Sequence, residues 1–525
     1  MQADMVIVNA RILTFDEAVP SAEAVAIRCG RIVFVGSNND VNRFIGDSTV
    51  VVDANGRIAL PGLIDAHLHL ASLGFSLVWL NLRGVKSIEE LKQKVFEAAS
   101  KVPEGTWIIG RGWDQELFSE KRYPNRWDLD EVAPRHPVLL TRVCGHVIVV
   151  NSLALKLAGI SRDTKDPIDG IIDRDEGGEP TGILREGALG LVWRAVPEPS
   201  IEDYEKAIER AIDEALRFGL TTVHAVSVTA NEFSALQRLW LTGRLKIRVR
   251  AYLSYDLLES LKGSGILGQY GDDFLRICGI KLLVDGSLGG RTAALREPYS
   301  DKPDVKGKLL MHEDKLSEII REAFQLNLQV AVHAIGDKAI EVVLNALEKA
   351  NIDSRFVRIE HVSLTPPDLL NKLEKLKPIV TVQPHFIITD WWVIDRLGED
   401  RGRYVYAFKS LQRLSLIIAG SSDAPVEPVN PWSGIYAAVT RGEFEGLRIS
   451  FVSPDEKMDL MDALRMYTVG GASASLEGDK LGRIKEGYYA DIIILDTTKF
   501  PPDNELEKIN VWMSIVGGKV VYRKH

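Results

Sequence analysis

Apolar runs of strand length alternate with helical patterns from about residue 205 onward, and this alternation constrains the fold more than any other feature. Helical patterns such as YEKAIERAIDEALRFG lie between some of the runs, and buried strands joined by helices are typical of a parallel sheet. These runs span 220–228, 247–254, 278–286, 328–337, 357–364, 379–386 and 416–425, and an eighth run at 58–70 precedes them. Eight such strands predict an α/β fold of the closed (β/α)₈ barrel type, with the active site at the C-terminal ends of the strands.

The two ends of the chain share a different texture, in which short alternating strands are separated by glycine-rich turns. We therefore predict one composite β domain from residues 1–60 and 478–525, and a barrel from 61–71 and 206–477. The stretch 72–205 is too long for a simple connection and breaks the alternation. We interpret it as an inserted α/β subdomain after the first barrel strand.

Composition argues against partners that require a basic surface. The 525 residues carry 64 Lys and Arg against 73 Asp and Glu, a net charge of −9, so we expect no binding to nucleic acid. The three cysteines show neither disulfide nor metal-cluster spacing, which favours a reducing compartment. The first residues do not resemble a signal peptide, and no apolar run approaches the roughly 18 residues of a membrane span. We predict a cytoplasmic protein with no membrane contact.

Two histidines at the end of the first barrel strand form the strongest local motif. His67 and His69 are two residues apart in the run IALPGLIDAHLHL. Alternate residues of a strand point to the same face, so both imidazoles can reach one metal ion. Solvated or core histidines are the alternative interpretation, and metal-ligating side chains at other strand ends count against it.

Further candidate ligands follow later strands. His333 and His361 each come at the end of an apolar run, and Asp423 lies in the loop after the last run. Neutral imidazole is the commonest protein ligand of Zn²⁺, and a carboxylate completes such a site. Lys281 stands inside an apolar strand, where its amine must be paired, neutralised or modified. It either pairs with Asp285 or, with a lowered pKa, reacts with carbon dioxide to give a carbamate that bridges two cations.

These motifs together resemble the amidohydrolase superfamily, and within it amidohydrolase family 3, the N-substituted formamide deformylase-like enzymes. The likeness rests on PGLIDAHLHL, KLLVDGSLGGRTAAL, VHAIGD, EHV, VQPHF, GSSDAP and GRIKEGYYADIIILD, which occur in this order over nearly the whole chain. The resemblance implies a metallohydrolase barrel with a small β-sandwich built from both termini. It also implies one or two divalent metal ions, taken here as zinc.

The resemblance assigns roles to individual residues. His67 and His69 would bind the more buried metal with Asp423, whereas His333 and His361 would hold a second metal. Carboxylated Lys281 would bridge the two ions.

Other assignments concern contacts with the substrate and proton transfer. The resemblance places His146, from the motif CGHVIVVNSLAL, near the site, and Arg291, after the turn DGSLGG, is a candidate clamp for a substrate carboxylate. His385 in VQPHF is a candidate for contacting the substrate or the developing oxyanion. Asp423 would act as general base and then as general acid toward the leaving nitrogen.

The expected function is hydrolysis of a non-peptide C–N bond in a small amide-like molecule of the N-acyl, N-formyl or cyclic amide type, by metal-activated water. A mononuclear deaminase is the close alternative, although such members carry Glu three residues after the fifth-strand histidine, where this chain has Gly336. Ester or lactone hydrolysis uses the same chemistry. An inactive metal-binding regulatory or assembly protein is an alternative of another class. For the assembly we expect a homodimer.

Overall fold

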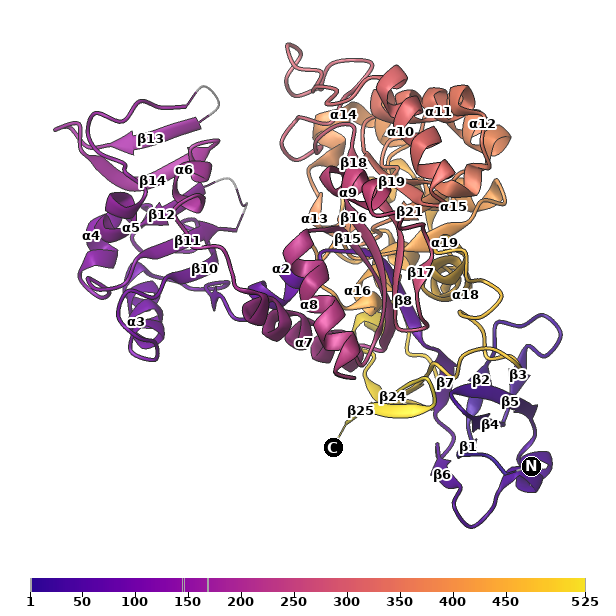
Figure 1. Ribbon diagram of the computed structural model, residues 1–525. Coiled ribbons are helices and arrows are strands. Elements are labelled where there is room, and N and C mark those ends of the chain that lie inside the picture. The colour runs from indigo at the N-terminus through magenta and orange to yellow at the C-terminus, as the bar shows by residue number, and fades with distance from the viewer. Residues whose placement is uncertain (1, 144, 146, 168–169, 525) are drawn as a thin grey trace. The chain divides into compact units, whose positions relative to one another are not determined.

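The computed structural model describes residues 2–143, 145, 147–167 and 170–524. The chain forms two compact units, one from the residues up to 74 together with those from 201 onward, and the other from 75–200 (Figure 1). The second unit occupies the segment that the sequence assigns to an insertion at 72–205. Both chain ends and the barrel belong to the first unit, so the composite β domain and the barrel are packed together.

Eight parallel strands form the barrel sheet, and neighbours in the sheet follow one another along the chain. They are β8 (Leu63–Leu68), β15 (Leu220–Val228), β16 (Arg248–Ser254), β18 (Leu275–Leu283), β19 (Gln329–Ala334), β20 (Val357–His361), β21 (Ile379–Val382) and β22 (Ile418–Gly420). Each overlaps one of the eight apolar runs of the sequence, which confirms the predicted barrel. A short strand, β17 (Tyr270–Gly271), pairs antiparallel with β18.

The sheet is nearly closed because the segment after β22 is bonded to the end of β8. The backbone N–H of Asp423 donates to the carbonyl of His67 at 2.8 Å, and that of His69 donates to the carbonyl of Ala424 at 2.9 Å. These bonds join the first and last strands at their C-terminal ends. Residues from opposite ends of the barrel sequence therefore meet at one place.

The helices between the strands bury amphipathic faces. In α7 (Ile201–Arg217), Ile208, Ile212 and Leu216 recur at helical spacing and are all buried. The other long helices are α8 (Ala230–Leu241), α10 (Glu313–Gln325), α11 (Asp337–Ala350) and α12 (Pro367–Leu376). The others are α2 (Leu70–Ser76), α9 (Leu258–Gly263), α13 (Phe386–Thr389), α14 (Val393–Gly402), α15 (Phe408–Arg413), α16 (Pro431–Thr440), α17 (Arg448–Val452), α18 (Leu460–Arg465) and α19 (Gly471–Ala474). Within the described residues, none combines the length and apolar character that a membrane span requires.

Two sheets built from both chain ends pack face to face as a β-sandwich. One sheet has the order β5-β4-β1-β6 and the other β25-β24-β23-β7-β2-β3, so the C-terminal strands lie beside N-terminal ones (Figure 1). Ile7, Ile27, Ile492 and Ile515 contribute to one shared buried core. The strands are β1 (Met5–Val8), β2 (Arg11–Leu13), β3 (Ser21–Ala22), β4 (Ala24–Arg28), β5 (Arg31–Gly36), β6 (Val50–Asp53), β7 (Ile58–Pro61), β23 (Ile492–Leu495), β24 (Val511–Val516) and β25 (Lys519–Arg523); α1 (Asn38–Val41) follows β5.

The unit of residues 75–200 is a mixed six-stranded sheet with helices, in the strand order β13-β14-β12-β11-β10-β9. Two separate apolar clusters stabilise it, one around Leu140 and Val149 and the other around Leu139 and Ile148. Neighbouring strand residues thus point to opposite faces, and both faces are covered. The elements are β9 (Leu80–Asn81), α3 (Ile88–Ala99), β10 (Ile108–Trp113), α4 (Arg126–Asp130), β11 (Val138–Arg142), β12 (Val147–Val150), α5 (Ser152–Leu157), β13 (Gly170–Arg174), β14 (Pro180–Glu186) and α6 (Leu189–Trp193).

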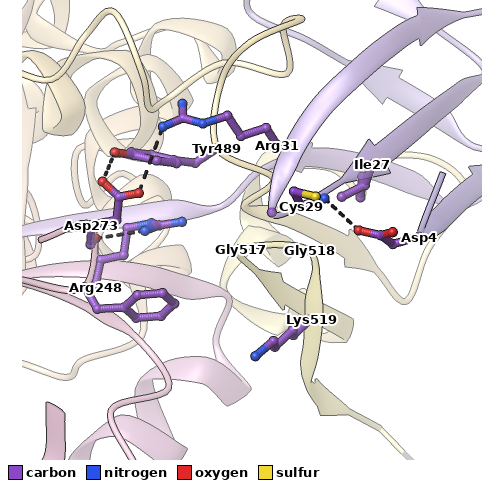
Figure 2. Close-up of a pocket in the computed structure, with 12 residues that line it drawn as sticks. Asp4, Ile27, Cys29, Arg31, Arg248, Asp273, Tyr489, Gly517, Gly518 and Lys519 are labelled. Atoms are coloured by element: carbon purple, nitrogen blue, oxygen red, sulfur yellow. Dashed lines mark hydrogen bonds and ion pairs between the residues drawn. The ribbon is translucent and has the colours of Figure 1, made fainter. Parts of the chain in front are cut away.

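A cavity of about 440 Å³ lies where the sandwich meets the N-terminal ends of the barrel strands (Figure 2). The Tyr489 ring lies between the guanidinium groups of Arg31 and Arg248, at 4.4 and 4.1 Å. Arg248 is buried, and its Nε and Nη2 atoms bind Asp491 at 2.7 and 2.9 Å. These paired charges hold the sandwich to the barrel, at the end of the strands opposite to the predicted ligands.

Candidate metal centre

All six predicted metal ligands lie toward the C-terminal ends of barrel strands. His67 is in β8, Lys281 in β18, His333 in β19 and His361 at the last position of β20, whereas His69 and Asp423 follow β8 and β22 directly. Two of them have left-handed backbone angles that non-glycine residues rarely adopt, since φ is 76° at His361 and 57° at Asp423. Such local strain occurs preferentially at functional sites.

Three of the six side chains form a compact donor set. His67, His361 and Asp423 each offer one ligand atom, and these atoms lie within 4.8 Å of one another. All three residues are buried, and Asp423 Oδ1 has no hydrogen-bond partner among the described residues. A buried carboxylate oxygen without a donor is costly, and a cation held jointly with imidazole nitrogens would satisfy it. The donor set therefore fits a divalent metal ion such as zinc.

His69 borders the same carboxylate oxygen. Its Nε2 atom lies 3.3 Å from Asp423 Oδ1, and the Nε2 atom of His67 lies 3.4 Å from it. Burial by itself would raise the pKa of Asp423, but the two neighbouring imidazoles lower it well below its usual range. Asp423 is thus an ionised carboxylate flanked by both members of the His-x-His motif.

The protonation of His361 suits a metal ligand. Its Nδ1 atom lies 2.7 Å from the amide oxygen of Gln383. An amide oxygen only accepts hydrogen bonds, so Nδ1 carries the proton and Nε2 keeps its lone pair. Burial lowers the pKa of His361 to about 3, which keeps the imidazole neutral. Metal ligation requires this neutral form.

His333 packs edge-on against His361, with ring centroids 4.4 Å apart. Its Nε2 atom lies 2.9 Å from the carbonyl oxygen of Gly286 and donates to it. The lone pair available for a cation is therefore on Nδ1. The structure brings His333 beside the donor set, while its place in a second metal site stays a prediction.

Lys281 is buried within the same region. Burial lowers its pKa to about 8, despite the opposing influence of the Glu360 and Asp423 carboxylates. The alternative of a close pair with Asp285 is not favoured, because Asp285 accepts hydrogen bonds from the backbone N–H groups of Ala294, Ile335 and Gly336. A lysine that is partly neutral near pH 7 suits carbamate formation, which stays a prediction.

The residues that hold the ligands in place are not among the candidates predicted from the sequence. Glu360 Oε2 lies 2.5 Å from His67 Nδ1, and Arg358 binds Glu360 in turn. Burial by itself would raise the pKa of Glu360, but Arg358 and His67 lower it overall, so the carboxylate is ionised. The signal was present in the sequence, since Arg358 and Glu360 are charged residues at alternate positions of an otherwise apolar strand.

Two of the three residues predicted to contact the substrate have side-chain partners within the protein. His385 precedes α13, and its Nδ1 atom lies 2.5 Å from Glu427 Oε2. Arg291 donates from Nε and Nη2 to Asp301 at 3.2 and 2.6 Å, so a substrate carboxylate would have to displace Asp301 from this fork. His146 lies outside the described residues. The roles of all three stay predictions.

Comparisons with known proteins agree with this geometry. The family model described as "Amidohydrolase family" matches residues 50–522. The chain is 34% identical to YtcJ of Bacillus subtilis, an amidohydrolase by name, over 98% of both chains. It is 27% identical to the N-substituted formamide deformylase of Arthrobacter pascens, over 99% of this chain and 98% of that one. A crystal structure of an uncharacterized metal-dependent hydrolase from Pyrococcus horikoshii is 37% identical, with a TM-score of 0.82 over 94% of this chain and 97% of that one. These matches confirm the resemblance drawn from the motifs.

Proposed function

Because the chain belongs to the amidohydrolase family and is a metal-dependent hydrolase of that type, acting on C–N bonds other than peptide bonds, we propose that its substrate is a small N-acyl, N-formyl or cyclic amide. The observation that carries the proposal is the buried donor set of His67, His361 and Asp423 with its unpartnered carboxylate oxygen. The similarity to a formamide deformylase over nearly the whole chain supports an amide-type substrate.

The metal we propose is zinc, as one or two ions. His67, His69 and Asp423 would hold the first, and His333 and His361 would hold a second, with carboxylated Lys281 as the bridge. His361 borders both groups, because its ligand atom lies within 4.8 Å of those of His67 and Asp423 and its ring packs against His333. A bound zinc ion supplies Lewis acidity, which makes water more acidic and polarises a carbonyl group. The nitrogen and carboxylate donors found here are those that zinc prefers.

The chain's own residues supply the proton transfers. Asp423 takes a proton from the attacking water and returns it to the leaving nitrogen, which is a poor leaving group unless it is protonated. His385 stabilises the developing oxyanion, and Arg291 and His146 contact the substrate. The carboxylate of Glu427 accepts the Nδ1 proton of His385, so the Nε2 atom of His385 is the one that faces away from this partner.

Deamination is disfavoured by the space around Gly336. A Cβ atom built on this glycine would lie 2.0 Å from the carbonyl oxygen of Ala294, and its N–H donates to Asp285 Oδ2 at 2.8 Å. The glutamate found at this position in the deaminases could not be placed without a backbone shift. Ester and lactone hydrolysis use the same groups and are separated from amide hydrolysis by the assay below. An inactive metal-binding regulatory or assembly protein would hold the metal without turnover, so the activity assay separates it from the hydrolase.

For the assembly and location we propose a cytoplasmic homodimer that acts on a small molecule. The net charge of −9 supports the absence of a nucleic-acid partner.

Metal content per chain tests the proposed function directly. We expect one or two zinc ions in the wild type by elemental analysis, and a loss of metal in Asp423→Ala. If Lys281 is carboxylated, Lys281→Ala will lose one ion, and added bicarbonate will raise the metal content of the wild type but not that of Lys281→Ala. A wild-type protein without stoichiometric metal would overturn the proposal.

Activity is then measured on a matched panel of N-formyl amines, N-acyl amines, cyclic amides, esters and amino-heterocycles. Release of an amine or of a ring-opened acid from the amides supports the proposal. Turnover confined to esters, or release of ammonia from the heterocycles, would replace it with one of the alternatives.

A further inference from the structure

A continuous chain of buried polar groups runs from His67 into the barrel interior. Glu360 Oε2 lies 2.5 Å from His67 Nδ1, and the Arg358 guanidinium contacts the two Glu360 oxygens at 3.0 and 3.3 Å. Arg358 Nη1 lies 3.0 Å from His224 Nδ1 and donates to it. None of these four side chains is more than 1% exposed. This series of hydrogen bonds therefore begins at a candidate ligand on β8, passes through β20 and ends on β15.

Arg358 is also tied to the backbone beside His67. Its Nη2 atom donates to the carbonyl oxygen of Ala66 at 2.6 Å and lies 3.3 Å from Thr381 Oγ1. One guanidinium thus holds the carboxylate that meets the His67 side chain and the peptide that precedes His67. Three barrel strands are linked at the level of the candidate metal centre.

Stability alone is a poor reason for this arrangement. Removing a carboxylate and a guanidinium from water carries a large desolvation cost, and well-packed apolar side chains often stabilise a core as well or better. The presence of Arg358 and Glu360 at alternate positions of β20 is therefore explained better by the side chain that they orient. Here Glu360 meets the ring nitrogen of His67 that points away from Asp423.

We propose that Glu360 and Arg358 are positioning residues that hold His67 in the tautomer and orientation needed to bind the metal ion. A carboxylate only accepts hydrogen bonds, so His67 Nδ1 carries the proton and Nε2 is the ring atom left for a metal ion beside Asp423. A carboxylate behind a ligating histidine also makes it a stronger donor. This inference rests on the proposed metal-dependent function and adds to it the residues that determine how tightly the metal is held.

The other candidate ligands have weaker partners, which makes the proposal specific. His361 is backed by the neutral amide of Gln383. His333 Nε2 donates to the Gly286 carbonyl at 2.9 Å and has the Asp285 carboxylate only at 3.5 Å, whereas His67 Nδ1 meets the Glu360 carboxylate at 2.5 Å. We therefore expect Glu360 to contribute more to metal affinity than Gln383.

The test measures zinc affinity of the full-length protein, by competition between the metal-free chain and a chromophoric chelator. Glu360→Gln keeps the shape and a possible acceptor but removes the charge, and we expect its zinc affinity to fall by about 10- to 100-fold. Gln383→Ala should fall less. The visible spectrum of the Co²⁺-loaded protein reports the ligand geometry and should change in Glu360→Gln.

Glu477→Gln is the matched control. Glu477 is as buried as Glu360 and also binds an arginine, Arg276, at 2.8 Å, but it lies with Arg250 near the N-terminal ends of the strands. Its substitution should lower thermal stability and leave zinc affinity and the Co²⁺ spectrum unchanged. If Glu360→Gln does not fold, Arg358→Lys provides the second variant, because it keeps the charge and loses the fork that reaches Ala66 and His224; we expect about a tenfold loss of affinity.

Wild-type affinity and an unchanged Co²⁺ spectrum in the Glu360 and Arg358 variants would overturn the positioning role, as would an equal loss of affinity in Glu477→Gln. In either case a zinc-binding wild type leaves the proposed function intact. A wild type that binds no zinc refutes the proposed function and this inference with it.

Discussion

The buried carboxyl group of Glu232 makes the stability of the protein depend on pH in a direction that can be worked out. Glu232 lies in the first turn of α8, is 7% exposed, and accepts a hydrogen bond from the backbone N–H of Ala71 at 3.1 Å. Burial raises its pKa from 4.5 to about 7, although hydrogen bonds from the backbone N–H groups of Ala71 and Thr229 oppose the shift.

A raised pKa in the folded state means that the folded chain holds this proton where the unfolded chain has released it. The stabilisation is therefore complete below pH 4.5 and is lost as the pH rises through about 7. The difference between the two pKa values corresponds to about 3 kcal/mol. Glu232→Gln removes the titration, so the variant should gain stability relative to the wild type by up to about 3 kcal/mol between pH 4.5 and pH 8.

Urea unfolding of the metal-free proteins at several pH values measures this difference. Glu202→Gln, which alters an exposed carboxylate at the start of α7, is the control and should show no such trend. The informative quantity is the change with pH in the free-energy difference between variant and wild type, because all other titrating groups cancel. A difference that stays constant from pH 4.5 to pH 8, or one that moves in favour of the wild type, would refute the reasoning.

Two further predictions concern the site. Gly336→Ala should destabilise the protein by about 1–3 kcal/mol, or prevent folding, because the new methyl group would lie 2.0 Å from the Ala294 carbonyl oxygen. A thermal melt checks this, and a variant with the wild-type melting temperature would contradict the prediction. Removing metal with a chelator should abolish hydrolysis and lower the melting temperature, and zinc should restore both, because a ligand that binds the folded state stabilises it; activity that survives complete metal removal would contradict the assignment.

The barrel could be predicted because each of its strands can be recognised from a short stretch of sequence. Buried parallel strands are continuous apolar runs, and each of the eight runs became a strand. The ends of the strands were less certain: β18 begins at Leu275, three residues before the apolar run was placed. The charged residue Arg276 breaks the run, yet it is accommodated because Glu477 binds it at 2.8 Å. Partners distant in sequence thus decided where this strand starts.

The candidate ligands could be named from the sequence because they follow apolar runs, but their grouping could not. The resemblance grouped His361 with His333, and the structure shows that His361 packs against His333 and also lies within reach of His67 and Asp423. Which residues meet depends on strand register and on closure of the sheet by the bonds between the ends of β8 and β22. Glu360 and His67 are 293 positions apart, so no local pattern relates them.

The sequence by itself therefore determined the number of barrel strands, the contribution of both chain ends to the sandwich, and the candidate side chains for binding a metal. Burial and periodicity, on which these predictions rest, are local properties. Only the tertiary structure decided which nitrogen of each histidine keeps its lone pair, which carboxylate oxygen lacks a donor, and which charges are paired. Those properties depend on the few ångströms that separate side chains from different strands, and folding of the barrel sets these distances.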